Sequence, residues 1–276
     1  MSAPSGDDYI LGRSDRETRR LMLQHQIYGP LTRRVFEAAG IGAGMKVLDL
    51  GSGAGDVALL LAEMVGPRGR VVGVDMNGHI LEAARARVAA VGWTHVVFHE
   101  GDVRTLPLDE DFDAIVGRFL LMYLPDPAAM LRHLATRVRR GGILAFHEND
   151  FSYPPTTFPP TPVYESIREW LVPKPGVSRG PEYRMGTKLF QAFVEAGLPE
   201  PELRLEAPIG GGPDWPGYEY LAETARSLLP ALQKVTGIDP AAVDVDTLAD
   251  RLRSEVTERN GIHMLPLMIG AWARTP

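Results

Sequence analysis

A glycine-rich loop carries the residues of this 276-residue chain whose types and spacing point most directly to chemistry. An apolar run at residues 45–50 leads into Gly51, Gly53 and Gly55, and a helical pattern begins directly afterwards. Glycine lacks a Cβ, so the backbone can turn tightly and a ligand can approach it closely. The pattern predicts a strand, a loop and a helix placed against a bound cofactor. By itself it also fits a tight turn without any ligand.

Carboxylates around this loop indicate which kind of cofactor it binds. Asp75 closes the next apolar run, twenty residues after Gly55, where a carboxylate can accept hydrogen bonds from both hydroxyls of an adenosine ribose. Asp56 stands where a nicotinamide or flavin fingerprint has its third glycine, and Asp49 precedes the first glycine. Negative charges repel a pyrophosphate and attract a cation. We therefore expect a positively charged cofactor instead of a dinucleotide.

The elements that position these residues alternate between apolar strands and helices. Continuous apolar strands separated by helices are typical of a parallel sheet covered on both faces, which predicts an α/β fold. The first strands are expected at 45–50, 70–75, 95–100, 112–117 and 143–147, with helices at 55–65, 78–91 and 127–139. Further along, we expect a helix at 186–196 and strands at 202–207 and 264–273.

Segments before and after this alternation are expected to be mostly helical. Two N-terminal helices are predicted, one from Ser14 to about Gln26 and one from Pro30 to Gly40. Eight of the 23 prolines fall between Pro154 and Pro181, so this stretch is expected to form a lid and not a sheet core. The predicted division is an N-terminal helical cover (1–40), a cofactor-binding core (41–150), a proline-rich lid (151–185), core again (186–209), a helical cap (210–260) and a final core strand (261–276).

Charge and composition exclude several classes of function. The net charge is −6, whereas binding to a nucleic-acid backbone depends on clustered Lys and Arg, so no nucleic-acid partner is expected. The absence of cysteine removes disulfides, thiolate metal sites and thiol nucleophiles, and it suits a reducing cytoplasm. No apolar run reaches the roughly 18 residues of a bilayer span, and the acidic start does not fit a signal peptide. We expect a cytoplasmic protein without a membrane partner.

Five motifs, in order and at matching intervals, resemble the class I S-adenosylmethionine (SAM) dependent methyltransferases. They comprise the glycine loop with its preceding acid, the acid ending the second strand, and three further segments at 100–103, 112–116 and 139–144. Outside residues 41–148, the segments 9–12, 148–151 and 185–189 are similar to a subgroup that methylates small molecules. The resemblance implies a Rossmann-like, mostly parallel seven-stranded sheet with helices on both faces, plus N-terminal helices and a mostly helical lid and cap.

The resemblance also implies which residues bind SAM. Asp49 would lie near the methionine amino group, Asp75 would hold the ribose, and Met76 would pack on the adenine. Asp102 with Val103 would meet the adenine edge, and the segment after the fourth strand would pass behind the sulfonium. The implied cofactor-binding set is Asp49, Gly51, Ser52, Gly53, Gly55, Asp75, Met76, Asp102, Val103, Gly117 and Arg118.

Catalytic candidates lie at the carboxyl end of the fifth strand. Methyl transfer mainly needs an in-line acceptor about 3 Å away, and a base is needed only when the acceptor must lose a proton. His147 is the candidate base, with a rate that falls as pH drops through about 6.5, and a structural hydrogen-bonding role fits it as well. Glu148, the next residue, is the second catalytic candidate, as a polar contact to the substrate. The other candidate substrate contacts are Gln24, His25, Tyr28, Tyr123 and Asn149, and no metal site is expected.

The leading hypothesis is a SAM-dependent methyltransferase that acts on a small organic acceptor of specialised metabolism. Oxygen is favoured as the methyl acceptor atom over nitrogen or carbon. Amide and nucleobase acceptors are disfavoured because GlyArgPheLeu stands at 117–120 where such enzymes carry an AsnProProTyr-like motif. Two alternatives are an enzyme that uses the sulfonium charge for a reaction such as a cyclisation, and a regulatory SAM-binding module. The chain is expected to be a monomer or a homodimer.

Overall fold

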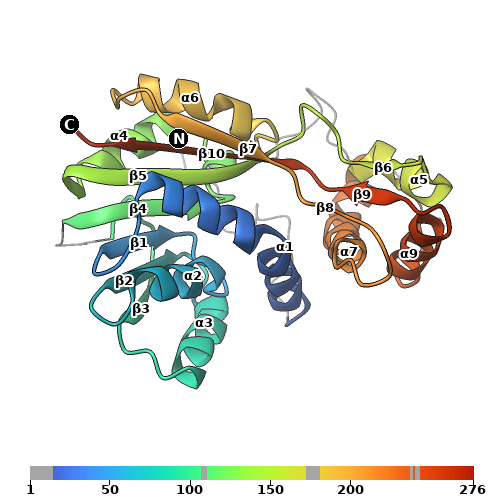
Figure 1. Cartoon of the computed structure of the whole chain (residues 1–276), viewed down its shortest axis with the longest axis horizontal. Coiled ribbons are helices and arrows are strands. Elements are labelled where there is room, and N and C mark those ends of the chain that lie inside the picture. Colours follow the sequence, from blue (N-terminus) through green and yellow to red (C-terminus); the bar gives the residue numbers. More distant parts are fainter. Residues whose placement is uncertain (1–14, 107–110, 172–180, 237–238, 240–242) are drawn as a thin grey trace. The chain divides into compact units, whose positions relative to one another are not determined.

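The computed structural model describes residues 15–106, 111–171, 181–236, 239 and 243–276, and the chain divides into two compact units (Figure 1). The sheet unit comprises residues 28–153, 178–207 and 266–276. The helical unit comprises residues 1–27, 154–177 and 208–265. The first boundary falls inside helix α1 (Asp15–Ala39), between Ile27 and Tyr28.

The sheet unit contains a seven-stranded, mostly parallel sheet, as the sequence predicts. Its strand order is β3-β2-β1-β4-β5-β10-β7 (Figure 1). The first five strands in this order pair in parallel, whereas β10 runs antiparallel to both of its neighbours. The bounds are β1 Lys46–Leu50, β2 Arg70–Asp75, β3 Val96–Glu100, β4 Phe112–Arg118, β5 Val138–Asp150, β7 Glu202–Glu206 and β10 Leu267–Arg274.

Helices cover both faces of this sheet because its strands are apolar on both sides. Val47, Ala114 and Ile143 pack with α2 (Asp56–Val65), α3 (Gly78–Ala90) and the second half of α1. Leu48 and Leu144, which point to the opposite face, pack with α4 (Pro127–Ala135) and α6 (Met185–Glu195). The parallel strands β1 to β5 therefore end at one common edge, where ligands of such sheets bind.

The helical unit has its own small core. Helices α5 (Pro162–Leu171), α7 (Gly217–Thr236) and α9 (Leu248–Glu258) enclose buried side chains that include Tyr164, Tyr218 and Leu252. A three-stranded antiparallel sheet completes this unit, in the order β6 (Thr156–Phe158), β9 (Ile262–Met264) and β8 (Ile209–Gly210).

Three elements differ from the sequence predictions. The two predicted N-terminal helices form the single helix α1, which contains Pro30. Pro30 removes one backbone donor, but the flanking segments have compatible helical patterns and the helix continues through it. The predicted strand at 264–273 divides into β9 and β10, which belong to different sheets. The proline-rich lid contributes strand β6 as well as a helix, because Thr156 to Phe158 pair with β9.

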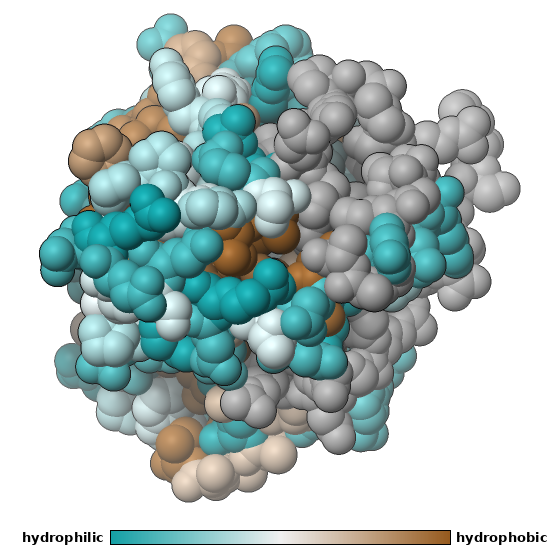
Figure 2. Space-filling model, turned by 90° about the vertical axis from the view of Figure 1, so that its right-hand side faces the viewer, coloured by the Kyte–Doolittle hydropathy of each residue, from teal (hydrophilic) through white to brown (hydrophobic). Residues whose placement is uncertain are grey.

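Hydrophilic residues predominate on the face drawn in Figure 2, where hydrophobic residues form only small separate patches. In the described part of the chain, no helix is both long and apolar enough to cross a membrane.

Candidate functional site

The glycine loop leaves β1 at the carboxyl edge of the sheet. The N–H groups of Gly51 and Ser52 both donate to the carbonyl oxygen of Val74, at 2.8 and 3.0 Å, which ties the loop to β2. Gly51, Gly53 and Gly55 have φ angles of 65°, 51° and 83°, in the left-handed region that favours glycine. At Gly55 an added Cβ would lie 3.0 Å from the Cβ of Ala84. Conformation and helix packing therefore both require glycine in this loop.

Asp75 ends β2 beside the loop and keeps capacity for a ligand. One carboxylate oxygen accepts a hydrogen bond from Gly53 N at 2.9 Å, and the other accepts from Asn77 N at 2.8 Å. Burial raises the pKa of the carboxyl group, while these amide donors act in the opposite direction. Each carboxylate oxygen retains a further lone pair, so both can accept from a diol. The adjacent Met76 side chain is 63% exposed and offers an apolar surface there.

Asp49 is a buried carboxyl group on which the Arg118 charge and the Ala58 amide act only from a distance. It belongs to β1, and neither carboxylate oxygen is within hydrogen-bond distance of a donor in the described part of the chain. Burial raises its pKa well above the ordinary value, against the opposing effect of the Arg118 charge. An ionised carboxylate in such a place is unfavourable unless a cation or donor approaches it. This site therefore fits a positively charged group at the end of the loop.

Asp56 does not contribute a free charge to the loop, contrary to the sequence argument. Its carboxylate pairs with the Arg87 guanidinium at 2.6 Å, and the same Arg87 nitrogen donates to the carbonyl oxygen of Ala54 at 2.6 Å. The pair joins the start of α2 to the end of α3. Because Arg87 neutralises it, Asp56 serves the packing of two helices, and the negative charge available to a cofactor comes from Asp49 and Asp75.

Asp102 and Val103 follow β3 at the same edge. Arg104 binds both carboxylate oxygens of Asp102 through its Nε at 2.9 Å and adds a second contact through Nη2. This hydrogen bonding to Arg104 lowers the pKa of Asp102, which stays ionised. Val103 packs against the apolar cluster of the sheet unit. The pair can meet a flat ring with one polar edge.

A tight turn follows β4. A Cβ at Gly117 would come within 2.9 Å of the Phe146 ring, so glycine allows β5 to pack closely there. Phe119 adopts a φ of 55°, an uncommon backbone conformation for a bulky residue. Its ring meets Tyr28 edge-on at 5.4 Å, and the Arg118 guanidinium lies 5.8 Å from the centre of the Phe119 ring. Strained backbone of this kind is concentrated at functional sites.

Glu148 fixes this turn through hydrogen bonds to its backbone. One of its carboxylate oxygens accepts hydrogen bonds from Leu120 N at 2.9 Å and Leu121 N at 2.8 Å, where the short helix η2 (Leu121–Tyr123) begins. The other oxygen is buried, and no described residue donates a hydrogen bond to it. Burial raises the pKa of Glu148 to about 7, despite the amide donors. The geometry therefore gives Glu148 a role in fixing the backbone after β4.

His147 lies on the opposite face of β5 and is held by Thr32 of α1. The Thr32 hydroxyl donates to Tyr28 O at 2.9 Å and lies 3.1 Å from His147 Nδ1, so His147 Nδ1 must carry the proton of that second bond. Nε2 is then the basic nitrogen, and it is buried without a hydrogen-bond partner among the residues that the structure describes. Burial lowers the pKa of His147 to about 3, with Arg118 as a further cause. His147 is thus neutral near pH 6.5, and the expected fall in rate at that pH does not follow from its titration.

The proposed substrate contacts are spread over both units. Asn149 follows Glu148 on β5, and its buried side-chain oxygen has no partner. Tyr28 is buried beside Phe119, and Tyr123 ends η2. Gln24 and His25 belong to the helical unit, where Gln24 accepts a hydrogen bond from Arg20 at 2.9 Å. The structure brings His147, Glu148, Asn149, Tyr28 and Tyr123 to the ends of β4 and β5 in the sheet unit.

Some residues of this site could not be found from the sequence alone. Thr32 lies 115 residues before His147, and only the α1 packing brings them together. The strain at Phe119 has no signal in residue type. Asp150 accepts a hydrogen bond from Thr187 N at 2.7 Å and so holds the start of α6 against β5, a contact between residues 37 positions apart. Among the described residues, no group of three or more His, Cys, Asp or Glu side chains could hold a metal ion.

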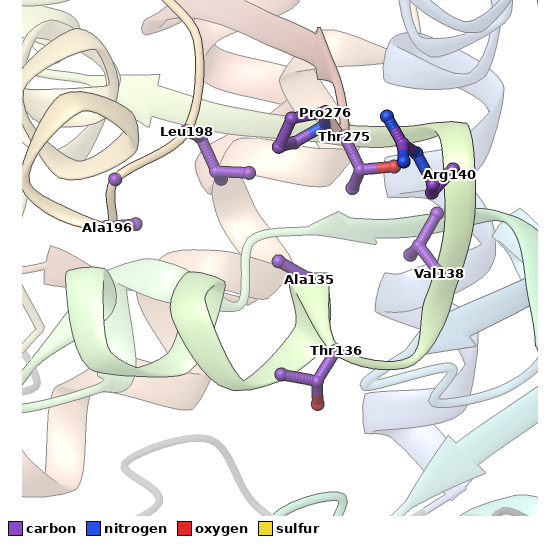
Figure 3. A pocket seen from close by; sticks show the side chains of 9 residues that line it. Ala135, Thr136, Val138, Arg140, Ala196, Leu198, Thr275 and Pro276 are labelled. Carbon is purple, nitrogen blue, oxygen red and sulfur yellow. The ribbon is translucent and has the colours of Figure 1, made fainter.

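A separate pocket of about 240 Å³ lies at the other edge of the sheet (Figure 3). It is bounded by the end of α4, the beginning of β5, the end of α6 and residues after β10. Its lining is Ala135, Thr136, Val138, Arg140, Ala196, Gly197, Leu198, Thr275 and Pro276. The glycine loop follows the opposite, carboxyl ends of the parallel strands, so this pocket is not the cofactor site.

The middle of the chain is similar in sequence to a known protein domain. Residues 41–171 match a family model described as a methyltransferase domain. A demethylmenaquinone methyltransferase of Staphylococcus aureus is 30% identical over 145 residues, which cover 52% of this chain and 55% of that protein. An uncharacterized protein of Mycobacterium tuberculosis is 28% identical over 149 residues, which cover 52% of this chain and 53% of that protein. The chain spans about half the length of these curated relatives.

Solved structures share the fold over a longer span. A Bacillus halodurans protein assigned as a methyltransferase aligns with a TM-score of 0.57 at 21% identity, covering 88% of this chain and 97% of that one. The [4+2]-cyclase SpnF aligns with a TM-score of 0.53 at 18% identity, covering 90% of this chain and 81% of that one. At these identities the likeness concerns the fold alone.

Proposed function

Because residues 41–171 form a class I SAM-dependent methyltransferase domain, we propose that this protein transfers the methyl group of SAM to a small organic acceptor. SAM supplies an electrophilic methyl group on a sulfonium, and the protein supplies binding, orientation and exclusion of water. Oxygen is the proposed acceptor atom.

The buried carboxyl group of Asp49 is the observation that carries this proposal. It requires a cationic partner, and the amino group of the methionine portion provides one. The neighbouring Asp75 has lone pairs for the ribose hydroxyls, and Met76 has exposed apolar surface for the adenine. Asp102 and Val103 complete the adenine edge, and Gly117 with Arg118 follow behind the sulfonium. The residues present therefore fit this cofactor.

Replacing Asp49 by Asn tests this assignment. Loss of a charge-assisted hydrogen bond is expected to weaken SAM binding about 10- to 100-fold, as titration calorimetry measures. Methylthioadenosine, which lacks the amino acid portion, should bind the parent and Asp49→Asn equally. The free variant should also melt at a higher temperature at neutral pH, because a buried group whose charged form is disfavoured is replaced by a neutral amide. Equal SAM affinity in both proteins would remove Asp49 from the cofactor site.

The helical unit is the proposed source of acceptor selectivity. Three of its aromatic side chains, Trp215, Tyr218 and His263, carry buried polar atoms that have no partner. The His263 ring lies 5.5 Å from the Tyr164 ring and 6.0 Å from the Tyr218 ring. Tyr164, Tyr218 and His263 are buried in the core of the helical unit, and the unpaired polar atoms of Tyr218 and His263 are the feature of this unit on which the proposal rests.

His147 is proposed to accept the proton or hydrogen bond of a hydroxyl acceptor through Nε2. His147→Ala is expected to lower the turnover rate about 100-fold, the lower end of general-base effects, while SAM affinity stays the same. Because the pKa of His147 lies near 3, this residue stays neutral from pH 8 to 5 and should cause no change in turnover over that range. This profile should be measured with Glu148→Gln also present, because Glu148 titrates near pH 7. A silent His147→Ala would instead indicate an acceptor that arrives as an anion.

Product analysis separates methyl transfer from the alternative use of the sulfonium charge. Methyl transfer converts SAM into S-adenosylhomocysteine in step with a methylated product, whereas a cyclisation assisted by the charge consumes no SAM. Mass spectrometry of both species, with extracts of small metabolites as acceptors, makes this distinction. A product formed without any S-adenosylhomocysteine would contradict the proposed function.

A further inference from the structure

An apolar strip lies along one edge of the seven-stranded sheet. It consists of Leu203 and Leu205 on β7 and Phe190 and Val194 on α6, which we call the edge strip. These four side chains are between 40% and 59% exposed. Single exposed apolar residues are ordinary, whereas a contiguous group is typical of an interface.

All four side chains belong to the same face of the sheet. Leu203 and Leu205 pair with Ala271 and Ile269 of β10, which pack in the apolar cluster that includes α6. Opposite residues on paired strands share a face, so both leucines point to the α6 side. On α6, Phe190 and Val194 continue at four-residue steps from Gly186, whose Cβ position lies 3.2 Å from the Cβ of Ile269. Phe190 and Val194 therefore continue the helix face that contacts β10, on the side of the sheet to which both leucines point.

Strand β7 is also an open sheet edge. In the described part of the chain it pairs only with β10, and it ends the strand order of its sheet (Figure 1). Such an edge leaves backbone donors and acceptors for another strand. Glu202, Arg204 and Glu206 alternate with the two leucines and place opposite charges on the face away from α6. On that face Glu206 also pairs with Arg34 of α1 at 2.8 Å.

This charge pattern is complementary to itself in a twofold antiparallel pairing. A pairing centred on Leu205 places Arg204 opposite Glu206 twice and brings the two Leu205 side chains together. One centred on Arg204 would oppose Arg to Arg and Glu to Glu, which is unfavourable. One centred on Leu203 would bring Pro201 into the ladder, where it lacks a donor. The pairing centred on Leu205 joins residues 203–207 of both copies without any proline.

We propose that two copies of this chain associate through β7, antiparallel and centred on Leu205. The twofold axis then stands perpendicular to the sheet, so both α6 helices lie on the same face of one continuous sheet. The two edge strips meet across the junction and cover each other. Opposite charges flank the axis on the other face, which favours a second copy over an unrelated strand.

A residue on the axis meets its own copy, and this allows a sharp test. Leu205→Lys and Leu205→Glu should each be monomeric by sedimentation velocity, because like charges face each other. An equimolar mixture of the two variants should form dimers again, because Lys then faces Glu. Mixing Leu203→Lys with Leu203→Glu should restore no dimer that the single variants lack. The reason is that residue 203 faces Ala207 of the other copy and not residue 203.

Val91→Lys is the matched control, because Val91 is similarly exposed at the end of α3, far along the strand order from β7. This variant should remain dimeric, and all variants should keep the parent affinity for SAM, which shows that they are folded. A monomeric parent, a dimeric Leu205→Lys, or a mixture that stays monomeric would overturn the proposal. Recovery by the Leu203 mixture would overturn the pairing centred on Leu205.

Discussion

Asp75→Ala is expected to weaken SAM binding by about 2 to 3 kcal/mol, the range for losing a charge-assisted pair of hydrogen bonds. The carboxylate would hold both ribose hydroxyls, and it also fixes the loop through Gly53 N. Titration calorimetry measures the change directly. Methylthioadenosine shares the ribose, so its affinity should fall by a similar factor, in contrast to its unchanged binding in Asp49→Asn.

Asp113→Ala is the control for this experiment. Asp113 lies at the beginning of β4, where it accepts from Lys46 N at 2.8 Å and pairs with Arg139 at 2.6 Å. It lies at the amino ends of the parallel strands, whereas the glycine loop follows their carboxyl ends. Its removal should therefore leave SAM affinity unchanged. A folded Asp75→Ala variant with the affinity of the parent would contradict the assignment of the ribose site.

Glu148 should make the stability of the protein depend on pH in the neutral range. The folded protein binds this proton more tightly than the unfolded chain, since burial raises the pKa from 4.5 to about 7. The stabilisation is therefore complete below pH 4.5 and is lost as pH rises through about 7. The predicted loss in free energy of unfolding is about 3 kcal/mol.

Glu148→Gln and Glu148→Leu separate the charge from the hydrogen bonds. Glu148→Gln keeps an oxygen for Leu120 N and Leu121 N and cannot ionise, so it should match the parent at pH 5 and exceed it at pH 8. Glu148→Leu leaves both amides unpaired and should be less stable than Glu148→Gln by about 1 to 3 kcal/mol at either pH. Denaturant unfolding at both pH values gives these numbers. Parallel pH dependence in the parent and Glu148→Gln would show that another group titrates.

The seven strands of the main sheet could be predicted because their sequence signal is local. Continuous apolar runs such as 45–50 and 70–75 need only the strand period and their flanking glycines to be recognised. The glycine loop was equally readable, since its left-handed φ angles call for one residue type. The prediction of two N-terminal helices was wrong because of Pro30. A proline that starts one helix and a proline inside a longer helix cannot be told apart in the sequence.

The electrostatics of the site depended on contacts that no local pattern contains. The sequence showed Asp49, Asp56 and Asp75 as three acids near one loop, yet Arg87 neutralises Asp56 from another helix. Nothing in the sequence marks His147 as unusual. Its pKa lies near 3 because the packed fold buries it. The small sheet of the helical unit escaped prediction because its strands have only two or three residues, too few to show a period.

The isolated carboxyl group of Asp49 also bears on how much of this protein a cell can maintain. Burial disfavours its charged form, and ligand that binds only the folded form adds about 2.7 kcal/mol of stability at a concentration 100 times its Kd. Differences of this size change the unfolded fraction, and with it the rate of proteolysis, by large factors. The protein should therefore accumulate when SAM is plentiful and be degraded faster when SAM is scarce, so that its abundance follows the supply of methyl donor.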